Sequence, residues 1–264
     1  MLTIEGRNID CTETGEGPAV LFIPGSYSTT AAWRQVQRGL APGRRLVATS
    51  LCGYGGTSDS RSAQDFDIQH EVRVVEALAR HVDAPVHLVG HSFGGTVALA
   101  AALSGRIDVA SLALFEANPL ALIHSYGDGA VHQETLRTSR GFESAVAAGE
   151  PDAPGRIIDF WGGTGVYAAM PEPVQAYCRQ TCSVNVLDWR TDFAFDVGPP
   201  NLAALSIPVL LVRGSLANSA MVQMTDVMAA HLIDVRPVVV EGAGHFLITS
   251  HAAQCATLLD SFLP

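Results

Sequence analysis

The 264-residue sequence has no apolar run long enough to cross a membrane. A transmembrane helix needs about 20 predominantly apolar residues, whereas the longest apolar runs cover only residues 97–103 and 109–115. The first residues do not combine a positive charge with a following apolar stretch, so we expect no signal peptide. Charged residues make up only 16% of the chain and hydrophobic residues 48%, which excludes a disordered protein.

Basic residues and cysteine pairs are also scarce. Lys and Arg total 16 against 26 Asp and Glu, and the resulting net charge of −10 argues against nucleic-acid and anionic-membrane partners. The five cysteines are scattered and include no Cys-x-x-Cys, which favours reduced thiols in a cytoplasmic protein. No His-Glu-x-x-His or similar ligand spacing occurs, so we expect no metal ion.

Short apolar runs alternate with helical segments along most of the chain. Runs without polar alternation are typical of strands that are buried on both faces, and we expect them at 19–23, 46–49, 86–89, 112–115, 209–212 and 238–240. Helical spacing predicts helices at 69–81, 96–104, 221–231 and 252–262. This alternation predicts an α/β fold, a mostly parallel twisted sheet flanked by helices. The first dozen residues are expected to add an antiparallel hairpin at the edge.

One long segment interrupts this alternation. Residues 118–201 contain no convincing buried strand but include helix-like stretches at 134–148 and 174–182. We therefore expect residues 118–201 to be an inserted helical cap. Residues 1–117 and 202–264 would then form one α/β core.

The strongest local motif surrounds Ser92. Gly90-His91-Ser92-Phe93-Gly94 follows an apolar run and precedes a helical one, which is the context of a nucleophile elbow. Glycines are needed there because a tight strand-to-helix turn strains the central residue and leaves no room for flanking side chains. The turn would expose the Ser92 hydroxyl at the sheet edge, beside the positive end of the following helix.

A serine hydroxyl needs a base to become a nucleophile. His245, in Gly-Ala-Gly-His after the last predicted strand, is the best candidate among nine histidines, because loops at the carboxyl ends of parallel strands carry the chemistry of such sheets. His91 is expected to pack beside the elbow. Together, the elbow, the late histidine, the Pro24-Gly25-Ser26 loop and the position of the cap resemble the α/β-hydrolase family over nearly the whole chain.

The resemblance implies an oxyanion hole made of two backbone N–H groups. In the family one donor belongs to the residue after the nucleophile, here Phe93, and the other to the loop after an early strand, here Ser26. The family's loop usually begins His-Gly, whereas this one begins Pro24-Gly25; a backbone donor tolerates that change. Tyr27, next to Ser26, and Trp161, in the cap, are candidate substrate-binding residues, although cap aromatics are more often simply core.

The acid partner of the histidine departs from the family's common pattern. An aspartate is usual in the loop after the strand near Val212, but that loop contains Asn218 and no acid. An amide orients an imidazole without stabilising its positive charge, and such a change costs about 10⁴ in rate in a serine protease. Glu116, at the end of the strand at 112–115, is the favoured alternative. The remaining interpretations are that Glu116 only holds the cap entry and that a cap acid, Asp188 or Asp192, takes part.

The glycine-rich stretch from Cys52 to Ser58 lacks a complete Gly-x-Gly-x-x-Gly motif and follows the second predicted parallel strand rather than the first, so we expect no cofactor.

The predicted function is hydrolysis of a small, largely apolar ester, lactone or related acyl compound through an acyl-enzyme at Ser92. The alternatives are carbon–carbon bond hydrolysis or a lyase reaction at the same residues, and a non-catalytic ligand-binding member of the fold.

Overall fold

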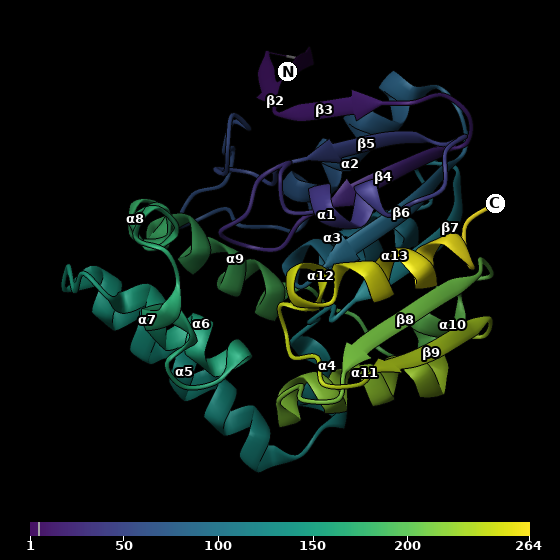
Figure 1. The fold of residues 1–264 in the computed structure, drawn as a ribbon. Coiled ribbons are helices and arrows are strands. Elements are labelled where there is room, and N and C mark those ends of the chain that lie inside the picture. Colours follow the sequence, from purple (N-terminus) through teal and green to yellow (C-terminus); the bar gives the residue numbers. More distant parts are fainter. Residues whose placement is uncertain (5) are drawn as a thin grey trace.

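A computed structural model, which describes residues 1–4 and 6–264, contains a seven-stranded sheet with the order β3-β5-β4-β6-β7-β8-β9 (Figure 1). The central and later strands are parallel, and only β3 runs antiparallel, against β5. The strands are β3 (Cys11–Thr14), β4 (Ala19–Ile23), β5 (Arg45–Thr49), β6 (Val86–His91), β7 (Val109–Phe115), β8 (Val209–Gly214) and β9 (Val235–Val240). The predicted α/β fold with a mostly parallel sheet is therefore confirmed.

The N-terminal edge differs from the expectation in detail. The hairpin of β1 (Leu2–Ile4) and β2 (Arg7–Ile9) forms its own two-stranded antiparallel sheet, and only β3 joins the main sheet. The predicted strands are all present, and β7 and β9 each begin three residues earlier than the strands predicted at 112–115 and 238–240. Polar or proline residues at the starts of these strands hid their true lengths.

Helices cover both faces of the sheet because successive strand side chains point to opposite sides. In β4, Leu21 packs in a core with α2 (Gln69–Val82), α3 (Phe93–Leu103) and α11 (Ser219–His231). Its neighbours Val20 and Phe22 pack in a second core with α1 (Arg34–Arg38), α12 (Leu247–Ser250) and α13 (Ala252–Asp260). This double burial explains the apolar runs without polar alternation.

Seven helices follow one another between β7 and β8, and we call residues 118–201 the cap segment; its boundaries stay a prediction. The helices are α4 (Ala121–Tyr126), α5 (Gly129–Ala147), α6 (Ala153–Gly162), α7 (Val166–Ala169), α8 (Glu172–Gln180), α9 (Cys182–Ala194) and α10 (Pro199–Ala203). Figure 1 shows α5 to α9 gathered beside one end of the sheet. Within the part of the chain that the structure describes, no helix combines the length and apolarity of a membrane span.

Truncating a side chain in the second core should destabilise the fold. Phe22 is fully buried, and its ring lies 5.5 Å from that of Trp33. Phe22→Ala should lower the free energy of unfolding by about 3–5 kcal/mol, because the cavity lies between the sheet and α1. Val239→Ala, at a half-exposed position of β9, is the control and should cost less than about 1 kcal/mol. Equal denaturant midpoints for the two variants would contradict this packing.

Candidate active site

Ser92 occupies a strained turn between β6 and α3. Its backbone has φ 54° and ψ −130°, an unusual conformation for a residue with a side chain. The Ser92 N–H donates to the carbonyl of Phe115, at the end of the neighbouring strand, with an N···O distance of 3.1 Å. The turn is thereby fixed to the end of β7.

Three glycines make this turn possible. A Cβ atom on Gly90 would overlap the Gly94 carbonyl, and one on Gly94 would overlap the Pro24 carbonyl, both far inside van der Waals contact. A Cβ atom on Gly95 would lie 2.6 Å from the Cβ of Ala117. The glycines therefore let α3 approach the backbone that follows both β4 and β7.

His245 joins Ser92 and Glu116 in one hydrogen-bonded chain. It lies in the loop after β9, and its Nε2 is 3.0 Å from Ser92 Oγ. Its Nδ1 is 2.9 Å from Glu116 Oε2. Since a carboxylate accepts hydrogen bonds, the Nδ1 proton faces Glu116, which leaves Nε2 free to accept from the serine hydroxyl. All three side chains are buried.

Glu116 is held in place by backbone on two sides. It follows β7 directly, in a left-handed conformation with φ 47°, and its N–H donates to the Val212 carbonyl at 2.8 Å. Its Oε1 accepts a 2.7 Å hydrogen bond from the N–H of Gly214, in β8. Both carboxylate oxygens therefore have a partner, and the second one is directed at His245.

Asn218, the alternative position for the acid partner, has other contacts. Its Oδ1 accepts from the Met221 N–H at 2.9 Å, which caps the N-terminus of α11. Its Nδ2 donates to the carbonyl of Phe160, in the cap segment, at 2.8 Å. In the structure, Glu116 is therefore the residue that contacts the imidazole. Asn218 instead caps α11 and binds the backbone of the cap segment.

His91 supports the site without sharing its chemistry. Burial, with a smaller contribution from the neighbouring His245, lowers the pKa of His91 to about 3, so its ring stays neutral. The ring Nε2 lies 2.8 Å from the carbonyl oxygen of His245 and donates to it. As expected from the sequence, His91 packs beside the elbow, where it holds the backbone of His245.

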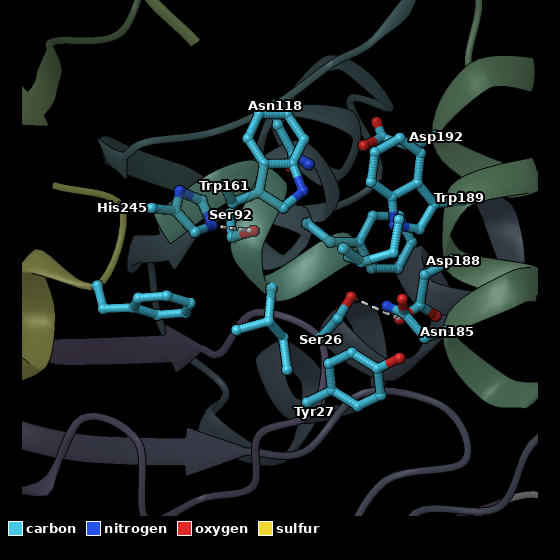
Figure 2. Close-up of a pocket in the computed structure, with 14 residues that line it drawn as sticks. Ser26, Tyr27, Ser92, Asn118, Trp161, Asn185, Asp188, Trp189, Asp192 and His245 are labelled. Carbon is cyan, nitrogen blue, oxygen red and sulfur yellow. Dashed lines mark hydrogen bonds between the residues drawn. The ribbon is translucent and has the colours of Figure 1, made fainter. Parts of the chain in front are cut away.

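A small pocket opens at Ser92, between the carboxyl ends of the strands and the cap segment (Figure 2). Its cavity has a volume of about 50 Å³. Trp161 stacks on the His245 ring, with centroids 5.3 Å apart and an angle of 25°. Both Trp161 and Tyr27 line this pocket.

Ser26 and Phe93 also line the pocket. Helix α3 begins at Phe93, and the first N–H groups of a helix have no acceptor within it. The Ser26 side chain donates to Asp188 Oδ2 at 2.6 Å, which ties its loop to α9. A Cβ atom on Gly25 would lie 2.9 Å from that of Ser92, so this loop passes close to the hydroxyl.

Asp188 has a structural role that the sequence did not reveal. Besides Ser26, its carboxylate accepts from the Tyr54 hydroxyl at 2.6 Å and from Arg61 Nη1 at 2.7 Å. Arg61 is itself fully buried and also pairs with Glu71 and Asp59. This ion cluster joins the cap segment to the core, and its Asp188 does not contact His245.

Asp192, the other cap acid, lies in the pocket one turn along α9 from Asp188. Burial raises the pKa of Asp192 well above its usual range; hydrogen bonds from Leu120 and Thr96 oppose that shift, and Asp188 adds to it. Asn185, Asp188 and Asp192 are spaced i, i+3 and i+7, which places them on one face of a helix. That spacing was the signal in the sequence that could have identified a polar wall of the pocket.

Comparisons with known proteins identify a matching family and several similar proteins. Residues 20–258 match the model of the alpha/beta hydrolase family. The chain is 27% identical to a fluoroacetate dehalogenase from Burkholderia sp. over 97% of this chain and 90% of that protein. It is 28% identical to a pimeloyl-[acyl-carrier protein] methyl ester esterase from Neisseria meningitidis, over 83% and 82%. The structure of an alpha/beta hydrolase enzyme from a Medee basin deep-sea metagenome library superimposes with a TM-score of 0.82 at 14% identity, covering 99% and 96%.

The elbow should not accept a methyl group at Gly94. Gly94→Ala should lower the melting temperature by several degrees or prevent folding, because the Pro24 and Ile23 carbonyls occupy the space. The matched control is Gly129→Ala, where no atom lies within 4 Å of the new Cβ and the chain is helical. That control should keep or raise the melting temperature. A Gly94→Ala protein as stable as the control would contradict the close approach.

Proposed function

The chain belongs to the alpha/beta hydrolase family, and within it we propose a serine hydrolase that cleaves a small, largely apolar ester, lactone or related acyl compound. The proposal depends on the hydrogen-bonded chain from Ser92 through His245 to Glu116, with its serine end at a small pocket. Membership of this family makes the protein a hydrolytic enzyme, and its relatives include an esterase and a dehalogenase.

The first half of the proposed reaction forms an acyl-enzyme. His245 Nε2 takes the proton of Ser92 Oγ as the oxygen attacks the substrate carbonyl carbon, and the Glu116 carboxylate stabilises the imidazolium. The carbonyl oxygen becomes an oxyanion, which the backbone N–H groups of Phe93 and Ser26 would bind. The intermediate then collapses, the alkoxide leaving group takes the proton from His245, and the ester bond breaks.

The second half uses water in place of the alcohol. His245 takes a proton from a water molecule that attacks the acyl carbon, and Ser92 leaves with that proton, which releases a carboxylic acid. The sum of both halves is ester plus water giving acid plus alcohol. The neutral His91, which holds the His245 backbone, contributes no proton to either half.

The identity of the nucleophile favours an acyl substrate over an alkyl one. If Ser92 displaced a leaving group from a saturated carbon, the product would be an ether, which has no carbonyl for water to attack. An acyl-enzyme ester at Ser92 has such a carbonyl, so water can hydrolyse it and restore the serine hydroxyl. The same argument favours ester cleavage here over the carbon–halogen cleavage named for the Burkholderia relative.

Removing the nucleophile should abolish turnover. Ser92→Ala should lower kcat on short-chain p-nitrophenyl esters by about 10⁴ or more, because no other group at the site forms the acyl-enzyme. A fluorophosphonate probe should label the wild-type protein at Ser92 and leave the variant unlabelled. Wild-type protein that neither labels nor hydrolyses any ester would favour a ligand-binding member of the fold instead.

The acid partner is tested by a pair of substitutions. Glu116→Gln should lower kcat by about 10⁴, because an amide does not stabilise the imidazolium and can select the wrong ring tautomer. Asn218→Ala should keep kcat within a few-fold while costing about 1 kcal/mol of stability through the lost helix cap. Full activity in Glu116→Gln, measured with the same esters, would exclude Glu116 as the partner.

A further inference from the structure

The wall of the pocket opposite His245 contains buried polar atoms without partners. Among the described residues, the Tyr27 hydroxyl, Asn185 Oδ1 and Asp192 Oδ1 are each buried and make no hydrogen bond, and all three residues line the pocket at Ser92. Figure 2 shows Asn185 and Asp192 on the α9 side, across the pocket from His245. Buried polar atoms in proteins are nearly always paired, so three in one small cavity indicate that a ligand supplies the partners.

The charges around this wall limit what the ligand can be. The chain contains no lysine, and no arginine is among the described residues that line the pocket. The buried Arg61 behind the wall is already paired with Asp188, Glu71 and Asp59. An anionic group would therefore find no free positive charge among the described lining residues.

The hydrogen-bonding capacity of the three atoms further limits which chemical groups the ligand can present to them. Asn185 Oδ1 only accepts, so the ligand must donate to it. The Tyr27 hydroxyl donates and accepts, and a protonated Asp192 carboxyl donates as well; burial, which raises the pKa of Asp192, favours that protonated form. Uncharged groups that donate or accept hydrogen bonds, such as hydroxyls and amides, supply these partners. Asn185 and Asp192 lie about 10 Å apart along the axis of α9, so they bind different groups of the ligand.

We propose that Tyr27, Asn185 and Asp192 form a subsite that binds uncharged hydroxyl or amide groups on the acyl part of the substrate. This inference rests on the proposed serine hydrolase function and makes the substrate class narrower: a short acyl chain that is polar and neutral at its far end. The small cavity favours a short acyl chain. A free carboxylate at the same position would have no positively charged partner among the described lining residues.

The subsite is tested with esters that differ only at one position. p-Nitrophenyl 3-hydroxybutyrate and 3-methylbutyrate exchange a hydroxyl for a methyl group of similar size, as do the 2-hydroxypropanoate and 2-methylpropanoate esters. The wild-type kcat/KM should favour the hydroxyl in at least one pair by about 10- to 100-fold, the effect of leaving buried polar groups unpaired. The p-nitrophenyl hydrogen succinate ester, with a carboxylate, should react at least about tenfold more slowly than the preferred hydroxy ester.

Substitutions at Tyr27 and Asp192 test whether these residues cause the preference for a hydroxyl over a methyl group. The variant at the end of the wall that the preferred hydroxyl contacts, Tyr27→Phe or Asp192→Leu, should lower the hydroxyl-to-methyl ratio of kcat/KM by about tenfold, and Asp192→Asn, which still donates a hydrogen bond, should retain most of the ratio. Thr225→Val is the matched control, since Thr225 Oγ1 is also buried and unpartnered but lies in α11, away from the pocket. This control should keep the wild-type ratio.

The outcomes separate the subsite from the proposed function. Hydrolysis of the esters with no preference for a hydroxyl in either pair would overturn the subsite and leave the serine hydrolase standing. A preference that survives in both Tyr27→Phe and Asp192→Leu would also exclude the subsite while the serine hydrolase stands. Hydrolysis of none of the esters would overturn the proposed function and, with it, the subsite.

Discussion

The pairing of β6 with β7 is the constraint on which the site depends. The register sets His91 opposite Phe115, so Ser92 and Glu116 are the first residues beyond the paired ends of neighbouring strands. Both adopt positive φ values at that point, and the Ser92 N–H is bonded to the Phe115 carbonyl. The two strands therefore deliver a hydroxyl and a carboxylate to the same edge of the sheet at a fixed separation. His245, arriving from the loop after β9, fits between them and bonds to both. A slip of one residue in this register would turn the side chains of the displaced strand to the other face of the sheet.

The sequence predicted the parts of this arrangement that follow from local pattern. Apolar runs located the buried strands because burial on both faces removes polar alternation, and the glycines around Ser92 marked a turn in which no Cβ fits. The choice of Glu116 over Asn218 came from its place at a strand end, and the structure brings that carboxylate to His245. The length of β9 was not predicted, since Arg236 and Pro237 interrupt its apolar pattern.

The cap segment was harder to interpret because its role depends on contacts between distant residues. Asp188 and Arg61 are 127 positions apart, and nothing local in either segment marks them as partners. Their burial is possible only because each charge is met by several others, as an isolated buried charge would be strongly unfavourable. The same cluster holds the Ser26 loop and Tyr54, so the shape of the pocket is set by the packing of α9 on the core. Helix periodicity places Asn185 and Asp192 on that side, but their unpaired atoms become visible only in three dimensions.

Because Glu116 supplies the carboxylate, the turn after β8 needs no acidic residue for His245. With the carboxylate supplied from β7, this turn caps α11 and bonds to the cap segment through Asn218. It also holds the loop that carries His245, because the Leu216 N–H donates to the Ala243 carbonyl at 2.8 Å and Ser215 Oγ accepts from the Gly242 N–H at 2.9 Å. The Leu216 side chain is largely open to solvent, so a substitution of that side chain leaves these bonds in place, whereas an insertion in the turn would move the imidazole.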